Sequence, residues 1–413
     1  MRKMKDSGVE WLGEVPAGWR VTPVKHLFFI SKVIAGKTGY DVLSITQRGL
    51  KVKDIKSGEG QLAADYSHYQ IVEPGDFAMN HMDLLTGWID LSDMTGVTSP
   101  DYRVFKSRIG KMNKRYYLRV FQHCYSARVF YGLCKGVSSK GRYRLPADAF
   151  NALRIPVPPL DEQLRIADYL DEKCAEIDRA ASAAEQSIEA YKTYKKSVVF
   201  QAVTKGLDAD VPMKDSGVEW LGEVPAEWDF DRLGGFFSLR SEKVSDEEYT
   251  PLSVTKGGVV PQLSHVAKSD DHANRKLVCK GDFAINSRSD RRNSCGFAVM
   301  DGSVSLINTI CIPRGEIESR YFGYLFDSPQ WADEFYSWGH GIVADLWTTG
   351  WSDMKKILLP VPSLDEQRLI ADYLDEKCGA IDTVIAAKQA IIADLKAFKQ
   401  SLIYEVVTGK REV

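Results

Sequence analysis

The chain has 413 residues, 44% hydrophobic and 27% charged, with a formal net charge of −2. This length is too great for one hydrophobic core, so we expect two to four domains, and the composition is that of an ordinary globular protein. No apolar run is long enough to span a membrane, and the basic start of the chain is not followed by the apolar stretch of a signal peptide. The chain is expected to be cytoplasmic. Its seven cysteines occur singly, which supports neither a disulfide framework nor a zinc ribbon.

The first predicted element is a lead-in over residues 4–19 that contains glycine, proline and two tryptophans. Residues 213–228 repeat it, with Glu227 in place of Gly18. Such a composition predicts a packed, turn-rich segment rather than a helix. Its tryptophans are expected to be core residues.

Residues 20–155 consist of short β-type runs broken by Gly, Asn, Asp and Pro, with a few helical stretches. The same landmarks recur in order over 229–358, among them Leu-Ser-x-Thr, Gly-Asp-Phe-Ala-x-Asn and Arg-Tyr-aromatic. The rest of the two segments differs. We therefore expect two copies of one α/β domain with a common scaffold and diverged loops, as two different binding specificities would require.

Each domain is followed by a proline-led helix. The segment 155–178 returns almost unchanged at 359–382, and both copies continue with apolar residues in a heptad pattern that predicts a coiled-coil seam. The seam residues expected to form the spacer helices and their contacts are Ile166, Leu170, Ile177, Ile188, Ile370, Leu374, Ile381 and Ile392.

Charge predicts how the two helices pair. Residues 161–178 hold seven acids and two bases, whereas residues 192–205 hold four Lys and no acid; the second helix has the same polarity. An antiparallel pair would place each acidic half against the partner's basic half. Complementation of the helix dipoles explains the same pattern, and neither explanation favours a parallel pair.

The predicted fold is therefore mixed α+β: two tandem α/β domains separated by two long helices, which pack as an antiparallel coiled coil with pseudo-two-fold internal repetition. The expected boundaries are 1–155 for the first domain with its lead-in and 156–212 for the central helix. The second domain with its lead-in is expected at 213–358, and the C-terminal helix at 359–413.

Catalytic signatures are missing from the sequence. It contains no phosphate loop, dinucleotide fingerprint, HExxH, GxSxG or amino-methyltransferase tetrapeptide, and its seven His are scattered. We therefore expect no catalytic, cofactor-binding or metal-binding residue in this chain.

A window without acids lies between Asp101 and Asp148. It holds twelve Lys or Arg with six interleaved Tyr, which favours a surface that contacts nucleic-acid phosphates. A solvated basic face or an acidic protein partner are the alternatives. A second basic cluster, 288–293, follows the shared Gly-Asp-Phe-Ala-x-Asn landmark, and Arg and Asn are suited to base edges in the major groove.

Candidate DNA contacts are polar residues in the diverged loops. In the first domain they are Thr46, Gln47, Arg48, Asn80, His81, Lys135, Ser139, Lys140, Arg142 and Arg144. In the second they are Thr255, Lys256, Asn286, Arg288, Arg291, Arg292 and Thr348.

The whole chain resembles the specificity subunit of type I restriction–modification systems. The matching residues are the Leu-Asp-Glu-Gln-x-x-Ile-Ala-x-Tyr-Leu-Asp-x-Lys helices at 160–173 and 364–377, the Gly-Trp and Glu-Trp lead-ins, and the shared landmarks. The resemblance implies two target-recognition domains, each binding half of a bipartite, asymmetric double-stranded DNA site, and spacer helices that fix the gap. It also implies two modification (methyltransferase) subunits that bring S-adenosylmethionine, and restriction subunits that use ATP and Mg.

Two other hypotheses remain open from the residues alone. One is a non-catalytic coiled-coil scaffold whose flanking domains bind proteins. The other is an enzyme with an unfamiliar site in 20–155.

Overall fold

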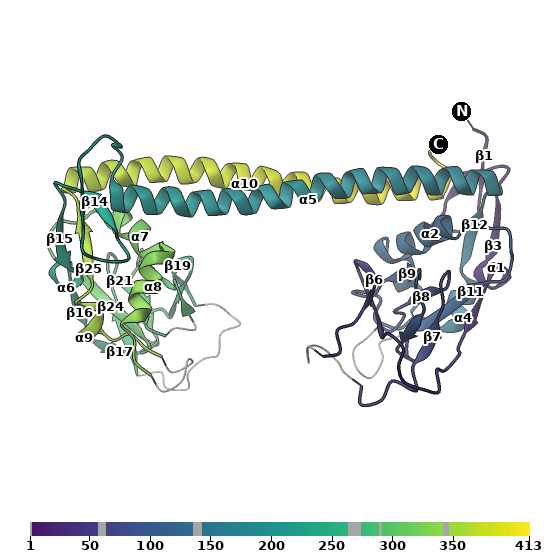
Figure 1. Cartoon of the computed structure of the whole chain (residues 1–413), viewed down its shortest axis with the longest axis horizontal. Coiled ribbons are helices and arrows are strands. Elements are labelled where there is room, and N and C mark those ends of the chain that lie inside the picture. Colours follow the sequence, from purple (N-terminus) through teal and green to yellow (C-terminus); the bar gives the residue numbers. More distant parts are fainter. Residues whose placement is uncertain (1, 57–62, 135–142, 263–273, 289–290, 342–346) are drawn as a thin grey trace. The chain divides into compact units, whose positions relative to one another are not determined.

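A computed structural model describes residues 2–56, 63–134, 143–262, 274–288, 291–341 and 347–413. The described chain forms two compact units, one made of Met1–Ala184 with Ala390–Val413 and the other of Glu185–Gln389. Each unit holds one domain and a part of both long helices, α5 (Leu160–Lys205) and α10 (Leu364–Val407) (Figure 1). The mixed α+β class is confirmed. The four-segment division stays a prediction, because the compact units combine segments that are distant in sequence.

Unit 1 is built mainly from short strands. They are β1 (Met4–Asp6), β2 (Glu14–Pro16), β3 (Arg20–Pro23), β4 (Phe28–Ser31), β5 (Leu43–Thr46), β6 (Gly49–Val52), β7 (Gln70–Val72), β8 (Phe77–Met79), β9 (Ile89–Leu91), β10 (Gly96–Thr98), β11 (Arg103–Ser107) and β12 (Arg154–Val157). The helices of its domain are α1 (Val24–Leu27), α2 (Lys114–Ser126), α3 (Val129–Gly132) and α4 (Ala147–Ala152).

Unit 2 repeats this order. Its strands are β13 (Met213–Asp215), β14 (Glu223–Pro225), β15 (Asp229–Arg232), β16 (Phe237–Arg240), β17 (Lys243–Val244), β18 (Leu252–Thr255), β19 (Gly258–Pro261), β20 (Arg275–Val278), β21 (Phe283–Asn286), β22 (Cys295–Phe297), β23 (Gly302–Val304), β24 (Asn308–Pro313) and β25 (Leu358–Val361). Its domain helices are α6 (Leu233–Phe236), α7 (Ser319–Asp327), α8 (Pro329–Ser337) and α9 (Trp351–Met354).

The central sheet of each domain is antiparallel and four-stranded. Its order is β4-β11-β8-β9 in unit 1 and β16-β24-β21-β22 in unit 2. Arg103 lies opposite Met79 in the first sheet, and Thr309 lies opposite Ile285 in the second. The same strand order and the same register establish position-by-position equivalence, with an offset of 206 residues in this part of the domains.

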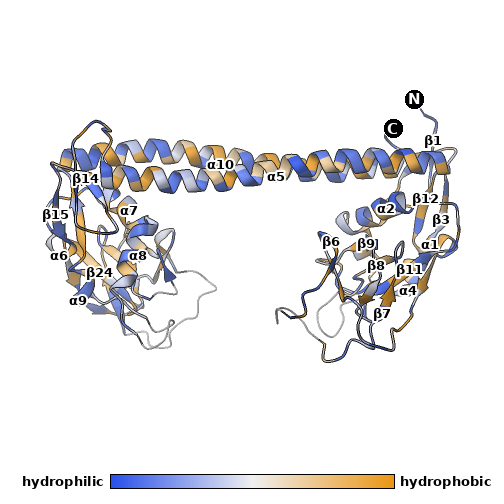
Figure 2. Ribbon diagram, viewed as in Figure 1, coloured by the Kyte–Doolittle hydropathy of each residue, from blue (hydrophilic) through white to orange (hydrophobic). Residues whose placement is uncertain are grey.

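One face of each sheet is covered by aromatic side chains and a helix. In unit 1 the rings of Phe77 and Phe105 stack with centroids 4.9 Å apart, and Phe28 and Phe121 meet Phe105 edge-on. Offset and edge-to-face pairs of this kind add to the area that aromatic residues bury. Figure 2 shows apolar segments concentrated on the strands and inner helices of both domains.

The repeated Leu-Asp-Glu-Gln motif fastens the start of each long helix to its domain. The buried Gln163 side chain donates to Pro158 O at 2.9 Å and accepts from the backbone of Asn113, the residue that caps α2. Gln367 does the same with Pro362 O and Glu318 N. The glutamine therefore satisfies backbone groups at the start of two helices at once.

The glutamate of the motif binds the lead-in. The indole Nε1 of Trp19 donates to Glu162 at 2.8 Å, and Trp228 donates to Glu366 at 3.0 Å. Trp19 and Trp228 are buried, as expected of core residues, whereas Trp11 and Trp220 are only partly buried against the two cores. A buried carboxylate needs such partners, which explains why the lead-in and the helix motif are duplicated together.

The long helices run antiparallel within each unit, as predicted. In unit 2, Glu366 near the start of α10 lies beside Gly206, which follows the end of α5. Lys195, which comes earlier on α5, binds Asp382, which comes later on α10. In unit 1 Lys399 binds Asp178 in the equivalent way. The seam residues Ile166, Leu170, Ile177, Ile188, Ile370, Leu374, Ile381 and Ile392 are all buried.

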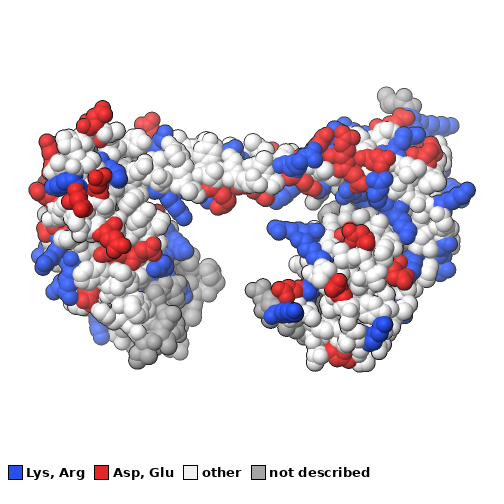
Figure 3. All heavy atoms as spheres, viewed as in Figure 1, with Lys and Arg blue, Asp and Glu red and all other residues white. Residues whose placement is uncertain are grey.

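The charge argument for this pairing was only partly right. Besides the two Lys–Asp pairs, acids near the start of each long helix contact an arginine in the domain of the same unit. Arg115 binds Asp168 and Asp171 at 2.6 and 2.8 Å. Arg320 binds Asp372 and Asp375 in the same manner. Figure 3 shows acidic side chains along the helices with basic side chains next to them. Much of the acidic charge thus joins helix to domain rather than helix to helix.

Candidate nucleic-acid interface

Most of the described basic side chains in the acid-free window between Asp101 and Asp148 have structural contacts, and the phosphate contacts expected of the window stay a prediction. Six of its basic side chains contact the protein itself: Arg103, Lys106, Arg108, Lys114, Arg115 and Arg119. Three of its tyrosines, Tyr116, Tyr117 and Tyr125, are buried in the core. Three of these side chains, Lys106, Arg115 and Arg119, bind acids that come from outside the window, and the other three bind backbone oxygens.

Two predicted contact sites lie on matching hairpin turns. In the β5–β6 turn the Thr46 hydroxyl donates to Gly49 O at 2.9 Å, and in the β18–β19 turn Thr255 donates to Gly258 O at 3.1 Å. Both threonines therefore shape the turn. Gln47, Arg48 and Lys256 are exposed at the tips, where they are free to meet a ligand.

The β5–β6 tip does not lie with the other candidates of its domain. Gln47 and Arg48 line a pocket of about 590 Å³ together with Lys396 and Lys399 of α10. His81 lines a different pocket, described below. The predicted residues of the first domain therefore form at least two separate surfaces.

Asn80 and Asn286 end or follow equivalent central strands, and their side chains are held by local turns. The Asn80 side-chain oxygen accepts from Met82 N at 3.2 Å, and that of Asn286 accepts from Arg288 N at 3.1 Å. The backbone oxygens accept from Tyr125 and Tyr336. Both amides are built into the scaffold, and the neighbouring residue is what differs between the domains.

The basic cluster of the second domain is divided. Arg288 pairs with Thr348 through a backbone bridge, so these two candidates do lie together. Arg292 binds Asp333 at 2.9 Å and lies over the ring of Tyr336. Arg288 and Arg291 are exposed. The candidates Lys135, Ser139, Lys140 and Arg142 lie outside the described residues.

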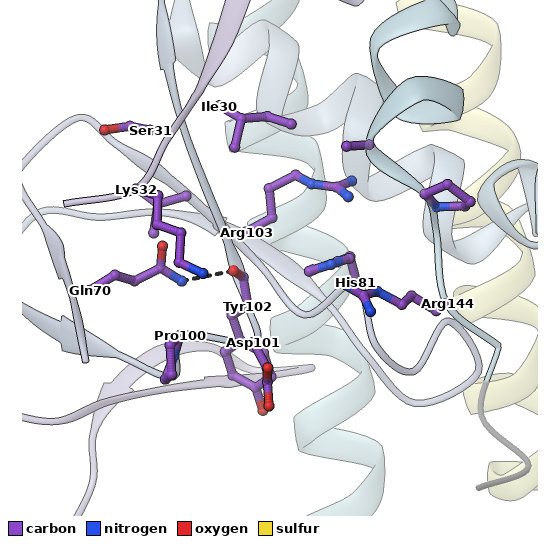
Figure 4. A pocket seen from close by; sticks show the side chains of 13 residues that line it. Ile30, Ser31, Lys32, Gln70, His81, Pro100, Asp101, Tyr102, Arg103 and Arg144 are labelled. Atoms are coloured by element: carbon purple, nitrogen blue, oxygen red, sulfur yellow. Dashed lines mark hydrogen bonds between the residues drawn. The ribbon is translucent and has the colours of Figure 1, made fainter. Parts of the chain in front are cut away.

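The most distinctive site in the first domain is a pocket of about 560 Å³, which we call the Arg103 pocket. Figure 4 shows that Arg103, His81 and Arg144 converge on it from three segments: β11, the end of β8 and the approach to α4. Its polar lining is Ser31, Lys32, Gln70, His81, Asp101, Tyr102, Arg103 and Arg144.

Sequence reasoning selected His81 and Arg144 but missed Arg103. Arg103 begins a central strand and is only 4% exposed, although its guanidinium carries a charge. One nitrogen donates to Leu145 O at 2.9 Å. The signal was present in the sequence, because an arginine stands at the start of the otherwise apolar run Val104–Phe105, where an ordinary core strand would not place it.

Burial controls the protonation of the pocket. It lowers the pKa of His81 to about 3, with the charges of Arg103 and Arg144 adding to the effect. Burial also lowers the pKa of Arg103, to about 10, which still leaves it cationic at neutral pH. The pocket therefore combines a neutral imidazole with permanently charged guanidinium groups. No cluster of His, Cys, Asp or Glu able to hold a metal occurs in the described parts of the chain.

The equivalent positions of the second domain have other side chains. Ser287 stands where the first domain has His81, and Thr309 where it has Arg103; their hydroxyls hydrogen-bond to each other at 2.8 Å. Lys276 stands where the first domain has Gln70. The Lys276 side chain donates to the backbone oxygen of Asn308, just before Thr309, and the Gln70 side chain donates to that of Tyr102, just before Arg103. The two domains also share a backbone hydrogen bond: Leu145 N donates to His81 O in the first domain, and Thr349 N donates to Ser287 O in the second. The scaffold is constant and its polar groups are not.

Two copies of one domain, each packed on an antiparallel pair of long helices, define the fold of the type I restriction–modification specificity subunits. A crystal structure of the HsdS subunit from Thermoanaerobacter tengcongensis matches 96% of this chain and 98% of its own, with a TM-score of 0.52 and 16% identity. A chain from a structure of type I R-M complex assembly and conformational transition matches 96% of this chain and 99% of its own, with a TM-score of 0.69 and 14% identity.

Sequence comparison agrees with the fold. The chain is 23% identical to the putative type I restriction enzyme MjaX specificity subunit of Methanocaldococcus jannaschii, over 97% of this chain and 96% of that protein. It is 23% identical to the MjaVIII specificity subunit of the same organism, over 64% of this chain and 63% of the relative, so less than two thirds of that protein is spanned. No protein-family profile matches. The resemblance predicted from the motifs is confirmed: this chain is similar to type I specificity subunits over nearly its whole length.

Proposed function

We propose that this chain is the DNA sequence-recognition subunit of a type I restriction–modification complex, and that each domain recognises one half of a bipartite, asymmetric site. The observation that carries the proposal is the pair of equivalent domains with different polar groups at equivalent positions. Sequence in DNA is distinguished by donor and acceptor patterns on base edges. Two copies of one DNA-binding domain with different side chains would recognise two different half-sites.

The side chains available for this role are those that the scaffold leaves exposed. They are Gln47 and Arg48 in the first domain, and Lys256 and Arg288 in the second. Thr46 and Thr255 shape turns, and Arg292 is held by Asp333. We assign those three to positioning of the loops rather than to base contacts.

The long helices are proposed to set the gap between half-sites and to bind two modification subunits. Their surfaces retain large apolar residues in the open, including Leu164, Leu369, Tyr373, Ile391 and Phe398, of which Leu369 is 63% exposed. Exposed apolar groups of this kind are typical of protein interfaces. In this scheme the chain is not an enzyme: S-adenosylmethionine, ATP and Mg belong to the modification and restriction subunits. No helix in the described residues is long and apolar enough to cross a membrane, and we place the complex in the cytoplasm.

Exchange of one domain tests the proposal. The chain is co-expressed with a modification subunit, and methylated adenines are mapped across the host genome. Replacing residues 20–155 with the corresponding segment of another specificity subunit should change one half of the methylated site and leave the other half and the spacer unchanged. A change in both halves would contradict the proposal.

A second assay separates the proposal from a protein-binding scaffold. Binding to a duplex that contains the mapped site should weaken steeply as salt rises, because phosphate contacts release counterions. It should also weaken when the half-site sequence is changed. A scaffold for proteins would show neither sequence preference nor a salt slope on DNA, and an enzyme would turn over substrate as the isolated chain.

A further inference from the structure

The Arg103 pocket contains a buried positive charge with no carboxylate bound to it among the residues that the structure describes. The guanidinium donates to Leu145 O and lies over the ring of Phe150 at 4.8 Å, and neither contact supplies a negative charge. Its Nη1 atom has no hydrogen-bond partner among the described residues. Burying a charged group without an ionic partner is costly. A buried charge without an ionic partner is typical of a site that is completed by a ligand.

The second unpartnered atom belongs to another residue that lines the same pocket. Nδ1 of His81, a side chain only 6% exposed, is also without a partner in the described part of the chain. A neutral imidazole can place its one proton on Nδ1 and donate it. Arg144 and Lys32 line the pocket from exposed positions and add two positive charges, against the single carboxylate of Asp101. In Figure 4 that carboxylate points away from the Arg103 guanidinium.

The second domain provides an internal comparison. At the positions of His81 and Arg103 it has Ser287 and Thr309, which satisfy each other at 2.8 Å. The shared scaffold is therefore stable with a small, neutral, self-paired group at this place. The fold does not need the charged Arg103 and the neutral His81, each with an atom that lacks a partner among the described residues, which indicates a function for them.

We propose that the Arg103 pocket binds one phosphate group, and that the second domain has no phosphate site at the equivalent position. A tetrahedral oxyanion offers several acceptors at once, to the guanidinium groups of Arg103 and Arg144 and to the His81 ring. Guanidinium–phosphate hydrogen bonds are charge-assisted and are the stronger kind. The edge of a base in an intact duplex is an unsuitable ligand, because Arg103 is too deeply buried to reach into a groove.

This inference rests on the proposed function for the source of the phosphate: in a chain that binds DNA, the phosphate would be a phosphodiester of the DNA backbone. Free phosphate has the same chemistry, so the two sources are tested separately. A backbone contact would hold the first domain in register on its half-site without reading sequence.

The first experiment uses inorganic phosphate and the full chain. The ring nitrogens of His81 are followed by NMR with ¹⁵N-labelled histidine, and the affinity is measured by calorimetry. The double variant His81→Ser/Arg103→Thr introduces the pair that the second domain already contains, so it should fold. It should bind phosphate about tenfold or more weakly. Arg144→Gln, at an exposed position, should weaken binding by a smaller factor. Arg154→Gln, an exposed arginine on β12 outside the pocket, is the matched control.

The second experiment uses a duplex with the mapped site. The double variant should lower the slope of log K against log salt by about 0.9, the value for one lost phosphate contact, without changing which sequence is preferred. Altered preference at one base pair would instead make the pocket a base-reading site and overturn the proposal. So would phosphate affinity in the double variant equal to that of the wild type, or no response of His81 to phosphate. Phosphate binding at Arg103 in a chain without sequence-specific DNA binding would overturn the proposed function and leave the pocket assignment in place, with free phosphate as its ligand.

Discussion

The hydroxyl of Tyr116 donates a hydrogen bond to the backbone oxygen of Val407, 2.9 Å away, and so joins α2 of the first domain to the final residue of α10. Tyr321 in the second domain makes the same bond, also 2.9 Å long, to Val203 near the end of α5. The last carbonyls of a helix lack partners within the helix. Each domain therefore completes the end of one long helix while its arginine, Arg115 or Arg320, binds acids near the start of the other.

Removing either hydroxyl should destabilise the unit that contains it. Tyr116→Phe and Tyr321→Phe each leave a buried carbonyl without its donor, so we expect losses of about 1–3 kcal/mol in the free energy of unfolding. Urea denaturation of the two variants measures them. Tyr194→Phe, at a position 48% exposed on α5, is the control and should be nearly neutral. Equal effects in all three variants would show that these hydrogen bonds add no stability.

The ion pairs between the long helices should contribute little. Lys399 lies 2.7 Å from Asp178, but the aspartate side chain is 62% exposed, so solvent screens the pair. A double-mutant cycle with Lys399→Ala and Asp178→Ala should give a coupling below about 1 kcal/mol that declines in high salt. The equivalent pair, Lys195 and Asp382, should behave alike. A salt-independent coupling above this range would show that we have underestimated these pairs.

Two glycines that follow the long helices should differ in how well they tolerate a side chain. Gly206 and Gly409 follow the long helices at φ of +73° and +74°, where alanine costs about 1–2 kcal/mol. A Cβ at Gly409 would also lie 2.5 Å from Pro16 and 2.9 Å from the buried ring of Trp19, whereas at Gly206 the nearest atom is 3.3 Å away. Gly409→Ala should therefore lower the melting temperature clearly more than Gly206→Ala. The reverse order would mean that the lead-in adjusts easily around the added methyl group.

The buried His123 should make the first domain sensitive to acid. Burial lowers its pKa from 6.5 to about 4, with Lys410 adding to the effect, and its ring stacks on Tyr404. Between these values the unfolded chain binds a proton that the folded chain excludes, so stability falls as pH drops from about 6.5 towards 4. At pH 5 the loss is about 2 kcal/mol.

His123→Phe keeps a ring at this place and removes the titration. Unfolding free energies at pH 7 and pH 5 should therefore differ by about 2 kcal/mol less in the variant than in the wild type. An identical pH dependence in both proteins would contradict the assignment.

The fold was predictable because duplication makes weak signals visible twice. The seam residues, the antiparallel pairing and the buried tryptophans followed from periodicity, charge and repetition. The partners within the motif could not be predicted. Nothing in the spacing shows that Glu162 accepts from Trp19 or that Gln163 serves the cap of α2, since these contacts join segments far apart in the chain.

The candidate site was predicted less well, for a physical reason. A run of basic residues looks the same in sequence whether it faces solvent or neutralises acids from elsewhere. Arg115 and Arg119 belong to the second kind, because the helix aspartates that bind them are some fifty positions away. Arg103 was counted only as one base of the acid-free window, because the sequence does not show which of these bases is buried and without an acidic partner.

The two units differ in how soon they can form during synthesis. Unit 2 is one continuous segment, Glu185–Gln389, whereas unit 1 needs Ala390–Val413 to finish its core with Leu402, Val406 and Val407. The core of unit 1 can therefore be completed only after all of unit 2 has been synthesised. Chains of this kind expose hydrophobic surface before their last segment arrives. The unit whose domain is synthesised first is thus the unit that can be completed last.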